Sequence, residues 1–149
     1  MPIGANMMTR ACKTYAVWTM AIIAFTQFSS AVMAEETYFP FDVKSYNGIS
    51  YVSGGIGFDE RKALDTVGKT YSLKLVFAKM GGAFVAIVDV EIKDNAERTI
   101  FKATSRGPWL YADLPSGRYT VTAASKGARI EKEIIIDGST QTEARFYWH

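Results

Sequence analysis

Residues 113–123 read DLPSGRYTVTA, a turn that runs directly into a strand. Pro115 fixes φ at the turn, and Gly117 supplies a backbone conformation that other residues rarely adopt. Side chains alternate between the two faces of a strand, so Tyr119, Val121 and Ala123 point to the same side. The segment therefore predicts a hairpin whose second strand has an apolar face.

The same period of two continues on both sides of this hairpin. From residue 71 onward, runs rich in β-branched and aromatic residues are separated by short turns of Gly, Pro, Asp and Asn. The predicted strands cover residues 71–78, 84–93, 99–104, 109–114, 118–123, 129–136 and 142–148. No long helical pattern interrupts them. The sequence therefore predicts a mainly β protein, an antiparallel, immunoglobulin-like sandwich of about seven strands.

A short helix is predicted before the sandwich, where residues 53–64 read SGGIGFDERKAL. Glycines ahead of a helix can cradle a phosphate, but this segment lacks the Gly-Lys-Ser/Thr ending of a phosphate-binding loop. Asp59 and Glu60 would also stand in the first turn, where the phosphate charge should lie. We interpret the segment as a flexible turn followed by an amphipathic helix at residues 58–67, which covers one end or edge of the sandwich.

The N-terminus has the pattern of an export signal. Arg10 and Lys13 precede an uncharged, mostly apolar run at residues 15–28, and small residues fill most of positions 29–34. The uncharged run is shorter than the ~20 residues that a bilayer-spanning helix needs. We expect cleavage after position 34, with position 31 as the second choice, and no stable membrane span in the chain that remains.

These patterns divide the chain into three parts. Residues 1–34 are the expected signal peptide, residues 35–70 an N-terminal extension with the glycine turn and the helix, and residues 71–149 the sandwich. The only cysteine, Cys12, lies in the first part, so we expect no disulfide in the rest. Of 17 basic and 15 acidic residues, two basic ones precede the cleavage point, which leaves a formal net charge of zero. A neutral chain argues against nucleic acid as a partner.

The hairpin at residues 113–123 resembles the L-P-x-G-x-Y-x-V hairpin of carboxypeptidase regulatory-like domains, which are prealbumin-like sandwiches. Val88, Val90 and Ile92 match the apolar positions of an earlier strand in that family, although the usual turn glycine is replaced by Asn95-Ala96-Glu97. The resemblance covers residues 71–148. Within the family, the chain looks most similar to small exported bacterial proteins that have no assigned activity. It implies a fold and leaves function open, since this sandwich hosts many roles.

The sequence offers few groups for catalysis. His149 is the only histidine, so a zinc site lacks its usual ligands, and the aspartates show no loop of spaced oxygen ligands for calcium. The part after the signal peptide has no cysteine nucleophile and no G-x-S-x-G motif. We expect a protein that is not an enzyme and that uses neither a metal nor a cofactor.

The ligand-binding candidates are aromatic. Trp109 and Tyr111 share a strand face beside the Gly-Pro break, and Arg106 precedes them. Exposed together, the two rings would form a platform for a sugar or a peptide, whereas buried they would be part of the core, which is the commoner outcome.

The best function class is a non-catalytic, exported binding or protein-interaction module, with an unknown protein or glycan as partner. We expect it in the bacterial periplasm, with secretion as the alternative. A carbohydrate-binding module that uses exposed aromatic residues is a second hypothesis. A structural or assembly partner in the cell envelope is a third, because pairing along a sheet edge would leave the same sequence pattern.

Overall fold

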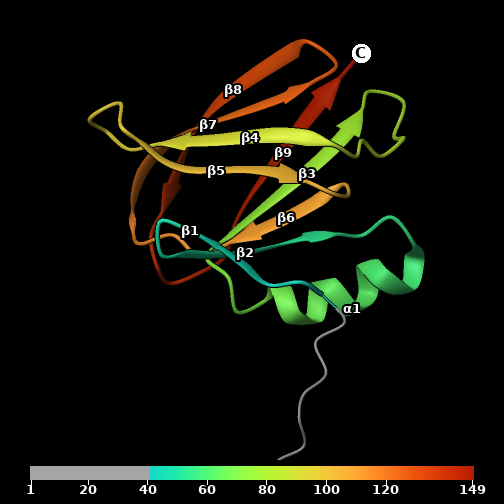
Figure 1. Cartoon of the computed structure of the whole chain (residues 1–149), viewed down its shortest axis with the longest axis horizontal. Helices are drawn as coiled ribbons and strands as arrows, with labels where there is room; N and C mark the ends of the chain where they lie inside the picture. Colours follow the sequence, from blue (N-terminus) through green and yellow to red (C-terminus); the bar gives the residue numbers. More distant parts are fainter. Residues whose placement is uncertain (1–40) are drawn as a thin grey trace, which may run out of the picture. The chain divides into compact units, whose positions relative to one another are not determined.

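The computed structural model describes residues 41–149, so the predicted signal peptide lies outside the described residues (Figure 1). This part of the chain is mainly β, with two sheets and one helix. The elements are β1 (Lys44–Tyr46), β2 (Ile49–Gly54), α1 (Phe58–Gly68), β3 (Leu73–Lys79), β4 (Val88–Lys93), β5 (Thr99–Ser105), β6 (Trp109–Ala112), β7 (Gly117–Ser125), β8 (Ala128–Ile136) and β9 (Thr142–Trp148).

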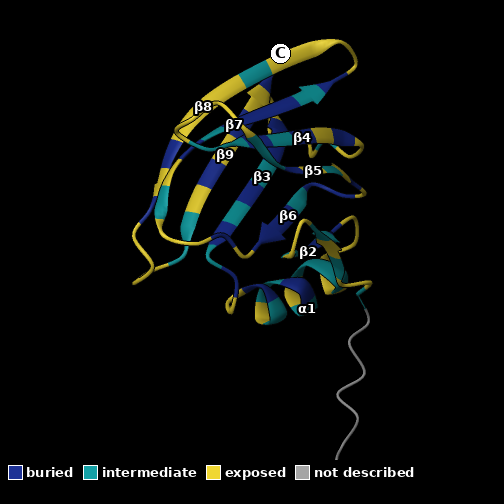
Figure 2. Ribbon diagram, turned by 60° about the vertical axis from the view of Figure 1, so that its left-hand side comes forward, coloured by how far each residue is buried: buried dark blue, intermediate teal, exposed yellow. Residues whose placement is uncertain are grey.

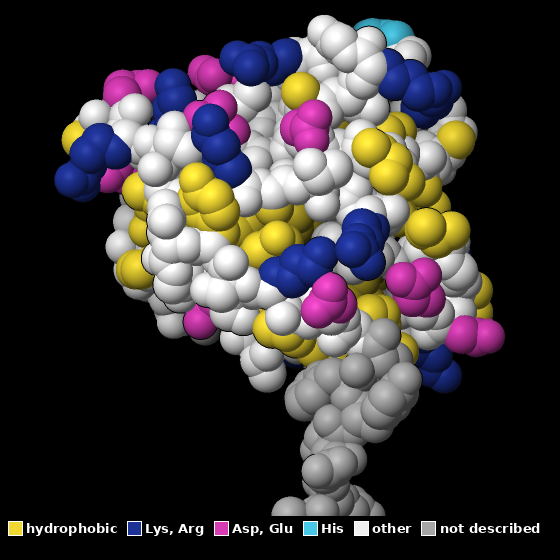
Figure 3. All heavy atoms as spheres, in the orientation of Figure 1, with side chains coloured by type: hydrophobic (Ala, Val, Ile, Leu, Met, Phe, Trp, Pro, Cys, Tyr) yellow, Lys and Arg dark blue, Asp and Glu magenta, His cyan; other side chains and the backbone are white. Residues whose placement is uncertain are grey.

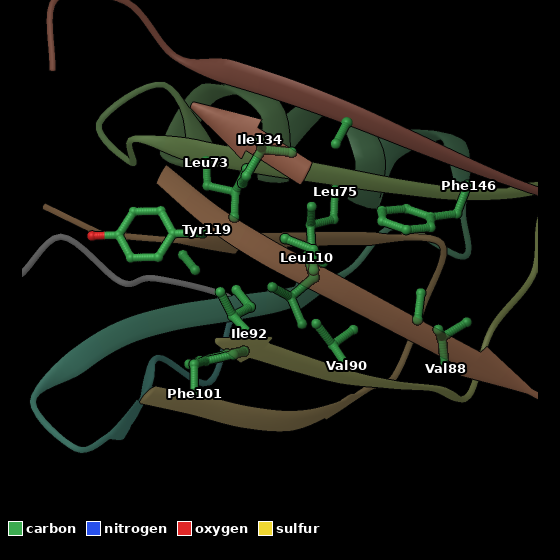
Figure 4. Packing of buried hydrophobic residues seen from close by; sticks show 14 of the residues in the cluster. Leu73, Leu75, Val88, Val90, Ile92, Phe101, Leu110, Tyr119, Ile134 and Phe146 are labelled. Atoms are coloured by element: carbon green, nitrogen blue, oxygen red, sulfur yellow. The ribbon is translucent and has the colours of Figure 1, made fainter. Parts of the chain in front are cut away.

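The strands form a five-stranded sheet in the order β1-β2-β6-β3-β9 and a four-stranded sheet in the order β5-β4-β7-β8. The inner faces of both sheets supply the main core, in which Leu75, Ile92, Phe101, Leu110 and Phe146 are fully buried (Figure 4). Buried and exposed residues alternate along most strands, as a half-solvated sheet requires (Figure 2). The mainly β sandwich architecture predicted from the sequence is thus present.

The turn and the apolar strand predicted at residues 113–123 form, but the predicted hairpin does not, because β6 belongs to the five-stranded sheet and β7 to the four-stranded sheet. The turn therefore carries the chain from one sheet to the other. Tyr119, Val121 and Ala123 are all buried on the inner face of β7. The Tyr119 hydroxyl donates a hydrogen bond back to the carbonyl oxygen of Pro115, at 2.9 Å. This bond pins the start of β7 to the turn before it, in the manner of the tyrosine corners of other sandwiches.

The five-stranded sheet begins earlier than the sequence predicts. Residues 44–54, which were expected to belong to an extension before the sandwich, form β1 and β2, and β2 pairs antiparallel with β6 from Tyr51↔Ala112 to Gly54↔Trp109. The described part of the extension is therefore built into the sheet. Strands on both sides of the boundary predicted at residue 71 thus share one sheet, a relation that a short strand does not reveal, because it carries no sign of where its partner lies in the sequence.

One pairing departs from the predicted antiparallel arrangement. β3 and β9 run parallel, in a continuous register from Leu73↔Thr142 to Lys79↔Trp148. The alternation of side chains is the same in both kinds of ladder, so the sequence pattern does not reveal strand direction. β9 is an edge strand of its sheet, with β3 as its neighbour.

The predicted strand at residues 84–93 is interrupted at Ile87. Phe84 forms an isolated antiparallel bridge with Ala78 of the five-stranded sheet, whereas β4 starts at Val88 in the four-stranded sheet. Ile87 has a φ of +59°, and this left-handed residue turns the chain from one sheet to the other. The loop between β3 and β4, residues 80–87, therefore protrudes at one end of the sandwich (Figure 1).

The predicted helix is present as α1, which covers part of the outer face of the five-stranded sheet (Figure 2). A second buried cluster forms beneath it from Val52, Leu64, Tyr71 and Tyr111. In residues 41–149 no helix combines the length and the apolar content that crossing a bilayer demands.

Candidate functional site

Trp109 and Tyr111 lie on the same outer face of β6, as predicted, but only one of them is accessible. Tyr111 is 0% exposed because α1 covers it, and its ring centroid lies 6.3 Å from that of Tyr71. Trp109 is partly buried, at the margin of this second cluster. The prediction of a Trp109–Tyr111 platform is therefore wrong for Tyr111, which belongs to the core.

Arg106 is exposed in the turn between β5 and β6, away from the accessible face of Trp109. It lines a separate hollow of about 290 Å³, together with Tyr51, Ser53 and Glu60. Its backbone N–H donates a hydrogen bond to the Ser53 hydroxyl oxygen, at 3.2 Å. Arg106 and Trp109 therefore line two different hollows.

The accessible side of Trp109 opens on a hollow of about 300 Å³ over β3, β6 and β9, which we call the Trp109 hollow. Phe84 and Tyr147 are 50% and 43% exposed and line the same hollow, so three aromatic rings border it. Val76 and Ala78 of β3 add apolar surface. Charged side chains close the rest, from Lys74, Glu143 and Arg145.

Lys74 is the best-anchored charge of this hollow, with a side chain that is only 12% exposed. Its Nζ lies 2.9 Å from Asp65 Oδ1 of α1 and 3.8 Å from Glu143 Oε2 of β9. The same ammonium stands 4.1 Å from the centre of the Trp109 ring, within the range of a cation–π interaction. Lys74 therefore ties the helix, the last strand and Trp109 together.

The electrostatics around Lys74 follow from these contacts. The hydrogen bond from Lys74 holds the pKa of Asp65 below its ordinary value, although partial burial opposes the shift. The Tyr111 hydroxyl donates to the same Asp65 oxygen at 3.1 Å. Burial, reinforced by Asp65, raises the pKa of Tyr111, so its hydroxyl keeps its proton. The group is a balanced ion-pair network that stabilises the wall of the hollow.

Trp109 carries an unmet hydrogen-bonding group. Its Nε1 is buried and has no hydrogen-bond partner within residues 41–149, the single such side-chain atom in that part of the chain. A buried polar group without a partner costs about 1–3 kcal/mol. Gly55 covers the ring, since a Cβ at that position would lie 3.7 Å from it.

Arg145 and Tyr147 form the rim of the hollow on β9. The Arg145 Nε donates to Glu143 at 2.5 Å, and the Arg145 side chain remains 60% exposed. The Arg61 guanidinium of α1 does not line the hollow but lies 4.9 Å from the centre of the Phe84 ring. The arrangement can hold a flat apolar group between rings, with exposed guanidinium surface nearby for an anionic group.

The glycine-rich turn before α1 is occupied by the protein's own carboxylate. Glu60 Oε2 accepts hydrogen bonds from the backbone N–H groups of Ile56 and Gly57, at 3.0 and 3.3 Å. The Arg61 Nη1 donates to the carbonyl oxygens of Gly55 and Ile56, at 2.9 and 3.0 Å. The helix start is therefore satisfied internally, which supports its interpretation as a structural turn.

Over the described range, residues 41–149, no three His, Cys, Asp or Glu side chains come close enough together to suggest a metal site.

Sequence reasoning identified Trp109 and missed its neighbours in the hollow. Lys74, an isolated charge inside the apolar strand at residues 71–78, was the available signal, because a lysine in such a strand has to find counter-charges. Phe84 and Tyr147 gave no signal, since their positions depend on the turn at Ile87 and on the parallel pairing of β9.

Comparisons of the chain with protein-family models, with curated proteins and with solved structures find no match.

Proposed function

We propose that the protein is a non-catalytic binding module exported to the bacterial periplasm, and that the Trp109 hollow is its recognition site. One observation carries the proposal: three aromatic side chains from three distant parts of the chain, Phe84, Trp109 and Tyr147, line one open hollow. Two of them keep about half of their surface in water, where an apolar partner group would be stabilised by covering them.

The charges at the rim indicate the kind of group that fits. Lys74 and Arg145 are positive and Glu143 is negative, so the side chains lining the hollow carry one excess positive charge. Lys74 is held by Asp65, and Arg145 pairs with Glu143 through its Nε but keeps 60% of its side chain exposed. Arg145 is therefore the group that can bind an anion. The preferred ligand is a peptide that places an aromatic or aliphatic side chain over Trp109 and a carboxylate at Arg145.

The fold assignment that accompanies this function is the carboxypeptidase regulatory-like, prealbumin-like sandwich. The buried face of β7 and the Tyr119–Pro115 hydrogen bond support it. In constant-type immunoglobulin domains the first two strands share a sheet. Here β3 and β4, the first two strands of the seven from β3 to β9, lie in different sheets, which favours the prealbumin-like alternative.

Export rests on the sequence of residues 1–34, with its basic start, uncharged apolar run and small-residue exit. The absence of cysteine after Cys12 is compatible with an oxidising compartment, because no free thiol is at risk there. The periplasm remains the proposed location.

The recognition site can be tested with two small probes that differ in one charge. N-acetylphenylalanine carries a carboxylate and N-acetylphenylalaninamide does not. Titration of the ¹⁵N-labelled protein should shift the amide resonances of residues 74–78, 109 and 143–147, and the acid should bind several-fold more tightly than the amide. Weak, millimolar affinity is expected for probes of this size.

Variants separate the two parts of the site. Tyr147→Ser should weaken both probes, whereas Arg145→Gln should remove the preference for the acid and leave binding of the amide. Ile135→Ser, which removes a different exposed apolar side chain on β8, is the matched control and should change neither. Shifts that gather elsewhere, or equal affinities for the two probes in the unmodified protein, would refute this site.

A glycan is the second candidate ligand, because partly exposed rings stack on sugars and the hollow holds three of them. In this alternative, Phe84 and Tyr147 would stack on the sugar beside Trp109, in the role that the sequence had suggested for the buried Tyr111. A neutral oligosaccharide that shifts the same resonances and binds equally well to Arg145→Gln would favour it over a peptide.

A further inference from the structure

Large apolar side chains gather at one end of the described molecule. Eight large hydrophobic residues are exposed in residues 41–149, and five of them come from the turn before α1, the first turn of α1 and the loop between β3 and β4. We call these five the apolar end: Ile56, Phe58, Met80, Phe84 and Ile87. Figure 3 shows hydrophobic side chains along the right-hand margin, where Figure 1 places these loops.

Contacts between the two loops make this end one surface. Arg61 bridges them, since its Nη1 donates to the carbonyl oxygen of Ile56 at 3.0 Å while its guanidinium lies 4.9 Å from the Phe84 ring centre. The Met80 N–H donates to the carbonyl oxygen of Trp148 at 2.8 Å, which joins the loop between β3 and β4 to the end of β9. These contacts hold the bases of both loops in place, and the loop tips protrude from them.

The presence of an isoleucine at position 87 is not explained by the stability of the fold. A left-handed φ of +59° disfavours a β-branched side chain in comparison with glycine. The side chain is also 67% exposed, so it recovers little of this cost by packing. The turn between the sheets needs the backbone conformation, whereas an exposed isoleucine at that turn is better explained by a surface that it contacts.

Positive charge surrounds the same end. A second hollow, of about 330 Å³, lies beside Phe84 and is lined by Lys79, Lys126, Trp148 and His149. No Asp or Glu side chain lines this hollow. Arg61 adds a third cation, 4.9 Å from the centre of the Phe84 ring. Asp59 and Glu60 follow Phe58 in the first turn of α1, so the positive charge is concentrated at the second hollow and not at the start of the helix. The formal net charge expected after residue 34 is zero, so this hollow is a local positive field on a neutral chain.

We propose that the apolar end docks on an anionic membrane surface, with the apolar side chains entering the interface and the cations facing lipid headgroups. Protruding apolar tips flanked by lysine and arginine are the combination that interfacial binding uses. The hollow between Lys79 and Lys126 is placed to receive a headgroup phosphate. This inference goes beyond the proposed function and does not depend on the Trp109 hollow.

A second copy of the chain is a poorer occupant of this surface. A two-fold dimer brings the same patch of both copies together. That arrangement would bring Lys79, Lys126 and Arg61 of both copies into one interface, where only Asp59 and Glu60 of α1 could offset them. An acidic membrane supplies the missing charge and also an apolar phase for the side chains.

The test is co-sedimentation of the purified protein with vesicles of two compositions. One is phosphatidylcholine alone, and the other contains about one third phosphatidylglycerol. The protein should bind the anionic vesicles clearly more tightly, and raising the salt concentration should remove most of the difference. Soluble glycerol phosphate should not displace it, because a headgroup alone lacks the apolar contact.

Two variants probe the two contributions. Ile87→Asn keeps a residue that tolerates a left-handed φ, so the protein should remain as stable as before or become more stable, while vesicle affinity falls about tenfold. Lys79→Gln with Lys126→Gln should reduce affinity for the anionic vesicles by about fivefold for each lysine. Ile135→Ser, an exposed apolar residue outside the apolar end, is the control and should bind as the unmodified protein does.

Several results would overturn the inference. These are equal binding to both vesicle types, an Ile87→Asn variant that binds as before, displacement by glycerol phosphate, or a concentration-dependent dimer that Ile87→Asn abolishes. The apolar end and the Trp109 hollow share Phe84 alone, and no variant in either assay changes that residue. The failure of one test therefore leaves the other standing.

Discussion

Lys74 shows how a single side chain can organise a surface. It lies on the outer face of β3, where a lysine would ordinarily extend into water, yet its ammonium is held between Asp65, Glu143 and the Trp109 ring. The helix and the last strand are thereby attached to the same point of the sheet. The stability of this group depends on the ionised carboxylate of Asp65.

The pH dependence of stability should reveal this attachment. The folded pKa of Asp65 is lowered from 3.8, so its ion pair stabilises the fold above that pH and is lost as the pH falls through the folded value. Asp65→Asn should be less stable near neutral pH by roughly 0.5 kcal/mol, a discounted figure because the carboxylate is 45% exposed. Urea denaturation between about pH 7 and pH 3 should show this deficit shrinking with acid.

Asp113→Asn is the matched control, because Asp113 is exposed and makes no ion pair among residues 41–149. A deficit of Asp65→Asn that stays constant from neutral to acidic pH would show that the Lys74 pair does not contribute.

Two residues on one strand face illustrate what sequence alone reveals. Trp109 and Tyr111 were correctly expected to share a face of the same strand, because alternation fixes that relation. Their opposite exposures depend on α1, which packs over Tyr111 through its own Leu64 and against Val52 of β2, both far from β6 in the sequence. The candidate site was therefore predictable in its strand and its face, and not in which ring would be accessible.

At the level of elements, the helix is fixed by its close approach to the sheet. A Cβ added at Gly68, the last residue of α1, would lie 2.2 Å from Cε1 of the buried Tyr111. The helix can end there only because the residue has no side chain. Gly107 is similar, since its Cβ would lie 2.2 Å from the carbonyl oxygen of Gly54.

Gly68→Ala should therefore destabilise the protein, although alanine is the better helix former by about 1 kcal/mol. We expect a loss of about 1–3 kcal/mol from overpacking against Tyr111. Gly81→Ala is the matched control, because nothing lies within 4 Å of its Cβ position, and it should change stability by less than about 0.5 kcal/mol. Equal urea midpoints for the two variants would contradict the placement of α1.

Strand positions were largely predictable, because each strand carries its own pattern. The strand expected at residues 142–148 matches β9 in full, and the runs at 99–104 and 129–136 match β5 and β8 to within one residue. The run at residues 84–93 was wrong in its first half, since Ile87 turns the chain into the other sheet. A left-handed isoleucine is too rare for a sequence pattern to predict.

For the molecule as a whole, pairing between distant segments dominates the architecture. Each residue of β3 pairs with the residue 69 positions later in β9, and β2 pairs with β6 across α1 and three strands. Neither the parallel direction nor the inclusion of β1 and β2 has a local signal, which is why the predicted sandwich was right in class and incomplete in topology.

These distant pairings should make folding slow. The segment between β3 and β9 must form a long loop before the two strands can pair, and this costs conformational entropy that local contacts do not offset. Folding should therefore take roughly milliseconds to seconds. Trp148 is buried within 6.2 Å of the Phe77 ring, so stopped-flow tryptophan fluorescence reports when β9 docks. Complete recovery of the Trp148 signal within microseconds would show that the β3–β9 ladder does not limit folding.

The parallel ladder between β3 and β9 also determines how the protein responds to tension. A pull on the start of β3 and the end of β9 runs along both strands, so all the hydrogen bonds of the seven paired positions carry the load together. β1 and β2, by contrast, lie at the opposite edge of the sheet, and their hydrogen bonds can break one after another. If the two ends of the protein were pulled apart, the N-terminal strands should therefore separate at a lower force than the ladder between β3 and β9.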